Sequence, residues 1–301
     1  MNLDWLDAFL LQGVFRVVMV LGLALLLHLQ MGLARIANFG VVGFWGLGAY
    51  AFAVLFVGVD WSIGEPWPFL ISMAFGAIVA GLAGLVVGWL IADLETEGVL
   101  VGTLGFASSV WILAITEQEL TGGALGMGGL RFPFDIGKTK ANELLWFGIL
   151  FAVVALIFFY VFRVHRSPYG RLLIAVGENE PLAGSLGKPA FRTKLWLFAV
   201  GSAGMGLLGA IHGVMAHLLI PESIGINVTL AAMVGLVLGG MLIWALVAVV
   251  GHARLLDEYV RHPPINNRRV LADYLVSQNI RFGSADFWDA YSTVFFSEEK
   301  V

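Results

Sequence analysis

The chain contains no cysteine and little charge, and these two shortages already exclude several classes of protein. Without cysteine there are no disulfides, thiolate metal sites or cysteine nucleophiles. Charged residues make up 13% of the sequence, against about 25% in soluble domains. A P-loop is also missing, because the spacing between Gly184 and Lys188 does not fit and Pro189 follows the lysine. We expect no catalytic residue, no metal site and no cofactor bound by this chain itself.

Apolar sequence dominates what is present. Hydrophobic residues make up 59% of the 301 residues, and the mean hydropathy is +0.89. The apolar runs are long and continuous rather than alternating, which favours membrane-spanning helices over a β-barrel. The composition therefore predicts an all-α polytopic membrane protein, embedded in the lipid bilayer.

About seven apolar segments reach the roughly 20 residues that a span requires. They lie at about 9–30, 40–58, 68–92, 97–116, 144–163, 194–219 and 228–250. The first two are separated only by Gln30 to Phe39, which is too apolar for an ordinary loop and too polar for the middle of a helix. A break within one discontinuous helix is the alternative to two spans, and it would change the count and the parity.

The basic residues predict the orientation, because cytoplasmic loops carry an excess of lysine and arginine. The densest basic cluster between spans lies in the 163–194 loop, which we expect to be cytoplasmic. The 117–143 loop and the N-terminus are then external, although that loop also contains three basic residues. The cluster consists of Arg163, Arg166, Arg171, Lys188, Arg192 and Lys194.

Composition changes after Val250, where the last 51 residues hold 13 of the 38 charged residues. We therefore divide the chain into a transmembrane domain, 1–250, and a small soluble C-terminal appendage, 251–301. An appendage of about 50 residues is too small to be expected to fold on its own.

The polar run SPYGRLLIAVGENEPLAGSLGK, 167–188, has the features of a docking helix. An apolar stretch from Leu172 to Val176 predicts a short amphipathic helix that lies at the interface or in a groove of a partner. Glu178 and Glu180 can pair with basic residues or cap the next helix, and Pro181 suits its first turn. An ordinary cytoplasmic loop anchored by snorkelling arginines is the alternative.

Three blocks in order resemble the permease subunits of bacterial branched-chain amino-acid ABC importers, the LivH/LivM family. GRLLIAVGENEPLAGSLG resembles the family's coupling loop, QMGLARIANFGVVGFWGLGAY (Gln30–Tyr50) its glycine-rich block, and LTGGALGMGG (Leu120–Gly129) its LTGG block. The resemblance covers roughly residues 30–240. It implies a bacterial inner-membrane permease that moves branched-chain or related small amino acids inward.

The resemblance also implies partners and site residues. The partners are ABC ATPase subunits that bind the ATP, a second identical or homologous permease subunit, and a periplasmic substrate-binding protein, with no nucleic acid. Residues expected to contact the ATPase are Arg171, Glu178, Glu180, Pro181, Leu182, Ala183, Gly184 and Gly187.

A translocation pathway is expected along the broken, glycine-rich segment and the external turn, since broken helices expose backbone groups to substrate. Its candidate residues are Gly32, Asn38, Gly43, Gly46, Gly48, Thr121, Gly122 and Gly123. Tight helix packing is the alternative for the first five, and a simple connecting turn for the last three. Arg35 departs from the family's pattern, and we expect it to be an interfacial anchor rather than a residue at membrane depth.

The C-terminus departs from the family. LeuGlyGly, 238–240, runs directly into MLIWALVAVVGHARLL, and the last 60 residues faintly resemble polytopic membrane glycosyltransferases. Two alternatives therefore stay open: a glycosyltransferase-like membrane enzyme, or a truncated or fused membrane subunit that does not transport. The enzyme would need an acidic residue in an external loop, for which the sequence offers Asp60, Glu65, Glu117, Glu119 and Asp135.

Overall fold

The computed structural model describes residues 4–62, 64, 66–91, 94–130 and 139–239. In this part of the chain seven helices are long and apolar enough to span a membrane. These helices confirm the prediction of an all-α polytopic membrane protein. The spans are Gly13–Leu33, Val41–Gly58, Trp67–Ile91, Thr96–Thr116, Leu144–Arg166, Ala190–Ala216 and Pro221–Gly239.

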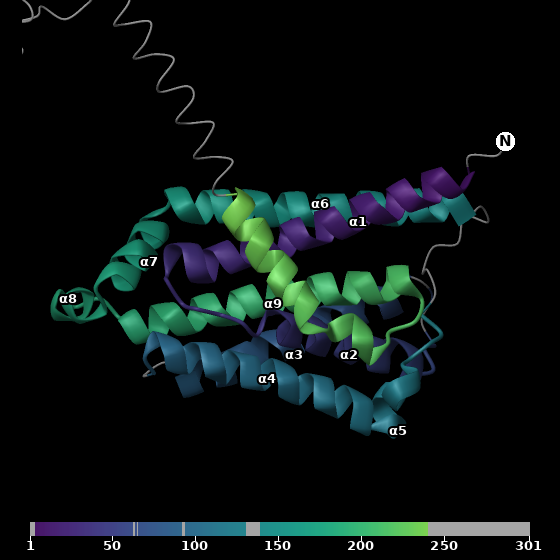
Figure 1. The fold of residues 1–301 in the computed structure, drawn as a ribbon, viewed down its shortest axis with the longest axis horizontal. Coiled ribbons are helices and arrows are strands. Elements are labelled where there is room, and N and C mark those ends of the chain that lie inside the picture. Colours follow the sequence, from purple (N-terminus) through teal and green to yellow (C-terminus); the bar gives the residue numbers. More distant parts are fainter. Residues whose placement is uncertain (1–3, 63, 65, 92–93, 131–138, 240–301) are drawn as a thin grey trace, which may run out of the picture. The chain divides into compact units, whose positions relative to one another are not determined.

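Helices follow one another with short connections along the described residues (Figure 1). In chain order they are α1 (Asp4–Leu27), the π-helix η1 (His28–Leu33), α2 (Val41–Gly58), α3 (Trp67–Ile91), α4 (Thr96–Thr116), α5 (Gln118–Thr121), the 3₁₀ turn η2 (Gly123–Leu125), α6 (Thr139–Arg166), α7 (Pro168–Glu178), α8 (Glu180–Ser185), α9 (Ala190–Ala216), the 3₁₀ turn η3 (Pro221–Ile224) and a last helix at 226–239.

Glycines bring α2, α3 and α9 into backbone contact at the centre of the bundle. A Cβ on Gly48 would collide with the backbone of Gly206, and a Cβ on Gly76 would lie 2.5 Å from the Gly48 carbonyl oxygen. A Cβ on Gly209 would collide with the carbonyl of Trp45. Close approach of small residues is the main way that helices attract one another in lipid, so these contacts fix the core.

The connections fall at two ends of the bundle (Figure 1). We call the end that carries α7 and α8 the coupling end; the turn between α3 and α4 lies there too, since Leu94 and Thr96 share a cavity with Lys194 at the start of α9. The other end carries α5, and α1 begins there (Figure 1). The predicted cytoplasmic loop and the predicted external loop therefore lie at opposite ends.

Three predictions fall wholly or partly on residues outside the described ranges. They are the end of the last predicted span, 240–250, the soluble appendage at 251–301 with its faint glycosyltransferase resemblance, and two of the acidic candidates, Glu65 and Asp135. The other acidic candidates, Asp60, Glu117 and Glu119, are exposed.

Candidate functional site

The predicted coupling loop folds as two short helices, and its sequence explains both helix starts. Ser167 precedes α7 and its hydroxyl accepts a hydrogen bond from the Gly170 N–H at 3.1 Å. Asn179 precedes α8 and accepts one from the Leu182 N–H at 3.0 Å. Such caps satisfy donors that the first turn leaves free, and the proline that follows each cap suits that turn. The amphipathic helix predicted for this loop is therefore present as α7.

One face of α7 is buried against the bundle. Leu173 and Val176 are inaccessible to solvent, and a Cβ on Gly170 would collide with the carbonyl of Val164 in α6. The Tyr169 hydroxyl donates to the Thr193 carbonyl of α9 at 3.3 Å. Burial, with a smaller contribution from Tyr160, raises the pKa of the Tyr169 phenol, which keeps it protonated as a donor. The helix is thus attached to both α6 and α9.

The two acids at the junction of α7 and α8 are both paired within the chain. Glu178 lies 3.7 Å from Arg35, and both side chains are mostly exposed. Glu180 forms an ion pair with Lys194 of α9, whose side chain is only 20% exposed. Because the Lys194 side chain is mostly buried, salt in the solvent screens the second ion pair less than the first. The predicted pairing of these acids with basic residues is confirmed.

The remaining predicted coupling residues lie on the outer surface of the coupling end. Leu182 is 56% exposed, and Arg171, Pro181, Gly184 and Gly187 are exposed as well; Leu186, which was not predicted, is 70% exposed beside them. Ala183 is the exception among them, because it is buried with Val176 and Ala190. The α7–α8 pair therefore holds both acids in ion pairs within the chain and presents an apolar tip outward.

The polar stretch after the first span is a re-entrant connection between two separate helices rather than a break within one helix. We use the name re-entrant connection for residues 34–40, which are not helical. Arg35 has a φ of 54°, the left-handed conformation that side chains disfavour, and the chain turns there. A Cβ on Gly40, at its other end, would lie 2.8 Å from the Thr103 carbonyl oxygen within α4, so α2 begins inside the bundle.

Buried polar side chains hold this connection in place. Asn38 donates to Gln30 Oε1 at 2.7 Å, and Gln30 Nε2 donates to the Phe198 carbonyl of α9 at 3.2 Å. Asn38 also accepts from the Gly40 N–H at 2.7 Å. Both side chains are inaccessible to solvent. Because unpaired polar groups are costly in an apolar interior, this chain of bonds fixes the relative position of η1, the connection and α9.

Two threonine hydroxyls accept hydrogen bonds from the backbone at the end of the connection and the start of α2. Thr103 Oγ1 of α4 accepts from the Phe39 N–H at 3.0 Å, and Thr229 Oγ1 of the last helix accepts from the Val42 N–H at 3.1 Å. Gln30, Thr103 and Thr229 were not among the site residues predicted from the sequence. Their signal was a lone polar side chain within an apolar run, which costs free energy in a membrane helix unless it has a partner.

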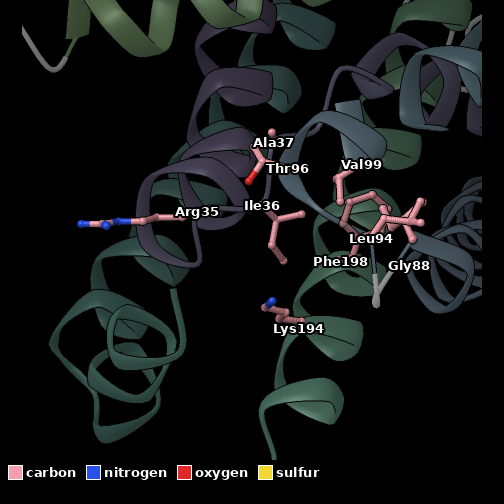
Figure 2. A pocket seen from close by; sticks show the side chains of 10 residues that line it. Arg35, Ile36, Ala37, Gly88, Leu94, Thr96, Val99, Lys194 and Phe198 are labelled. Atoms are coloured by element: carbon pink, nitrogen blue, oxygen red, sulfur yellow. The ribbon is translucent and has the colours of Figure 1, made fainter. Parts of the chain in front are cut away.

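A cavity of about 80 Å³ lies beside the re-entrant connection at the coupling end (Figure 2). Arg35, Ile36 and Ala37 line it on one side, with α9 and the α3–α4 turn on the others. Figure 2 shows the Arg35 side chain pointing away from the rest of the lining. The remaining lining residues are Gly88, Ile91, Leu94, Thr96, Val99, Lys194 and Phe198.

The other candidate pathway glycines lie in tight packing contacts. A Cβ on Gly43 would lie 2.8 Å from the Cα of Ala107, and one on Gly46 would collide with Ile224. Gly48 meets Gly206, as described above, and Gly32 lies under the His28 ring within η1. Of the first five pathway candidates, Asn38 is the one with a buried polar side chain.

The predicted external turn is ordered by its own residues. The Thr121 hydroxyl donates to the Ala114 carbonyl at 2.8 Å, and Gly122 and Gly123 both have positive φ. Met127 pairs with Leu219 through two backbone hydrogen bonds of 2.9 Å, which ties this turn to the end of α9. The turn therefore lies at the end of the bundle opposite α7 and α8.

Comparison with known proteins shows what the chain is similar to. A family model described as "Branched-chain amino acid transport system / permease component" matches residues 6–257, beyond the 30–240 that the motifs covered. The high-affinity branched-chain amino acid transport system permease protein LivM of Escherichia coli is 28% identical over 75% of this chain and 56% of its own length.

More distant relatives have other names. The autoinducer 2 import system permease protein LsrC of Enterobacter sp. is 26% identical over 62% of this chain and 51% of its own length. The L-arabinose transport system permease protein AraH of Escherichia coli is 29% identical over 48% of this chain and 41% of its own length.

The chain spans about half the length of the curated relatives it matches. No solved structure matches it. The match of the family model over most of the sequence, together with the seven spans and the LivM relatives, shows that the chain belongs to the family of branched-chain amino acid transport system permease components.

Proposed function

We propose that this chain is the membrane-spanning subunit of an ABC importer of the bacterial inner membrane, and that branched-chain or related small amino acids are its substrates. The chain itself is not an enzyme and binds no cofactor. A separate ATPase subunit hydrolyses ATP, a periplasmic protein delivers the substrate, and a second identical or homologous permease subunit completes the pathway.

The outward apolar tip of α8 is the observation that carries this proposal. Leu182 and Leu186 lie one helical turn apart and are largely exposed, whereas both acids of the α7–α8 pair are already in ion pairs within the chain. An exposed apolar surface beyond the ends of the spans suits a protein partner. The family supports an ATPase as that partner, because its members are permease components of transport systems.

The substrate class rests on names alone. The family description and the LivM relatives name branched-chain amino acids, whereas other relatives name autoinducer 2, arabinose and guanosine. Because the family description and the LivM relatives agree, branched-chain or related small amino acids are the proposed substrates. Uptake of arabinose or guanosine in place of amino acids would change this assignment.

Co-purification from membranes tests the ATPase partner. A Leu182→Asp/Leu186→Asp variant places two charges on the apolar tip without touching either ion pair, and we expect it to lose an ATPase that the parent retains. The matched control is Leu120→Asp/Leu125→Asp, which changes two leucines of similar exposure at the opposite end of the bundle. Retention of the ATPase by the first variant, or its absence from the parent, would refute the proposal.

Transport by the complex of the parent chain with its co-purified ATPase then tests the substrate. Reconstituted into liposomes with its partners, the complex is expected to take up labelled leucine in an ATP-dependent manner. Unlabelled isoleucine and valine should compete, and arabinose and guanosine should not.

A further inference from the structure

We propose that the re-entrant connection is a gate at the coupling end, and that α7 sets its position directly through its last turn. This inference rests on the proposed function only in that an ATPase would supply the movement of α7 and α8. The contacts that would transmit this movement lie within the chain.

A backbone contact is the first link between α7 and the connection. Gly177, in the last turn of α7, lies so close to residues 33 and 34 that a Cβ would be 2.8 Å from the Ala34 carbonyl carbon and 2.9 Å from the Leu33 oxygen. Both neighbours are backbone atoms, which cannot rotate away as a side chain does. A shift of the end of α7 is therefore passed on to Ala34.

An ion pair is the second link, one residue further along each segment. Glu178 ends α7 and lies 3.7 Å from Arg35, the residue at which the chain turns into the bundle. An exposed ion pair contributes little stability, so it serves to align the two segments rather than to hold them. The same acidic pair reaches α9 through Glu180 and Lys194.

The inner end of the connection is anchored, so movement at its outer end has a defined consequence. Asn38 holds Gln30, and Gln30 holds the Phe198 carbonyl of α9. Residues 36 and 37, between the two ends, are only half-buried and line the cavity. Displacement of Ala34 thus acts on the hydrogen bonds that join η1 to α9.

The cavity supplies the space for this movement. Two cations, Arg35 and Lys194, belong to its lining, but each is paired with a glutamate, so the charge needed to hold an anion is already neutralised. The remaining lining is mostly apolar. Arg35, Leu94 and Thr96 of its lining are exposed, so the cavity opens to the surface and leaves a non-helical segment room for a second position. Pressure from α7 would move residues 35–37 toward α9 and the α3–α4 turn.

A single cysteine can report on this movement, because the chain has none of its own. In Ala37→Cys, the new thiol lines the cavity, and its rate of modification by a maleimide is measured in the isolated, reconstituted chain. Adding Gly177→Ala should slow the modification several-fold, since the new methyl group presses Ala34 away from α7 and narrows the cavity. Gly184→Ala in α8 is the matched control, because its Cβ would meet nothing within 4 Å.

Charge reversal provides a second variant set that does not depend on tolerance of the Gly177 methyl group. Arg35→Glu should slow the modification of Ala37→Cys, because two acids then repel each other across the α7 contact. Arg35→Glu/Glu178→Arg should restore the parental rate. Equal rates in all of these backgrounds, or no restoration by the exchange, would overturn the proposal.

A last arm separates this inference from the proposed function. With the ATPase bound, ATP with vanadate should change the rate at Ala37→Cys in the parent and much less in Gly177→Ala. An unchanged rate in the parent would overturn the gate while leaving co-purification intact. Loss of the proposed function would instead appear as an absent ATPase, with the results in the isolated chain unaffected.

Discussion

Asn38 and Gln30 lie on either side of the turn between the first two spans, and a hydrogen bond of 2.7 Å joins their side chains inside the bundle. Neither side chain is accessible to solvent, and each has a second partner on the backbone. A polar pair of this kind is stable in an apolar interior only while both members remain bonded. It therefore specifies one arrangement of the re-entrant connection.

Removing both members of this pair should cost less unfolding free energy than the sum of the two single removals. Asn38→Ala leaves the Gln30 oxygen buried and unpaired, for which we expect a loss of about 1–3 kcal/mol in unfolding free energy. In Asn38→Ala/Gln30→Leu the orphaned amide is gone, so the loss should be smaller than the sum of the single losses. Thermal unfolding in detergent measures all three. Additive losses would show that the two side chains do not act as a pair.

At position 35, glycine should give a more stable protein than alanine, although glycine is usually the less stabilising of the two. Both Arg35→Gly and Arg35→Ala remove the ion pair with Glu178, but only glycine adopts a φ of 54° without steric cost. Because the left-handed conformation costs other residues about 1–2 kcal/mol, Arg35→Gly should be more stable than Arg35→Ala by about 1 kcal/mol. The comparison uses the midpoint of thermal unfolding, and the reverse order would contradict the left-handed turn.

One methyl group added at the glycine contact between α2 and α9 should push these two helices apart. Gly48→Ala brings a Cβ into the backbone of Gly206, and we expect a loss of about 1–3 kcal/mol as α2 and α9 move apart. Gly105→Ala is the matched control on α4, where a Cβ would meet nothing within 4 Å. Alanine there should be neutral or stabilising by up to about 1 kcal/mol. Equal effects at both positions would argue against the backbone contact.

The sequence was sufficient to predict the spans, because length and apolarity alone decide which segments cross a bilayer. It also predicted α7 and the place of Pro181 in the first turn of the next helix, whereas the capping residues are Ser167 and Asn179 rather than Glu178 or Glu180. The boundaries agree within a few residues for most spans, from Val41–Gly58 to Thr96–Thr116. Local features and composition therefore explain most of the fold.

Contacts between distant segments were not predictable in the same way. Nothing local in the sequence pairs Glu178 with Arg35 or Glu180 with Lys194, because each pair depends on how α7 and α8 lie against the bundle. Tight helix packing was the alternative reading for Gly48, but nothing in the sequence pairs it with Gly206. The Gln30–Phe198 bond, across 168 residues, likewise depends on the tertiary fold.

The two ends of the bundle should be labelled from opposite sides of the membrane. Leu125, beside the external turn, is 87% exposed, and Gly184 of α8 is exposed with open space around it. The basic cluster at the coupling end predicts that this end is cytoplasmic. A membrane-impermeant maleimide added to intact cells from which the outer membrane has been removed should therefore modify Leu125→Cys and spare Gly184→Cys, and inside-out vesicles should give the opposite result. Since the parent has no cysteine, each signal belongs to one position. Modification of Gly184→Cys in intact cells would reverse the orientation and remove α8 from the reach of a cytoplasmic ATPase, whereas the helix contacts within the bundle would remain as described.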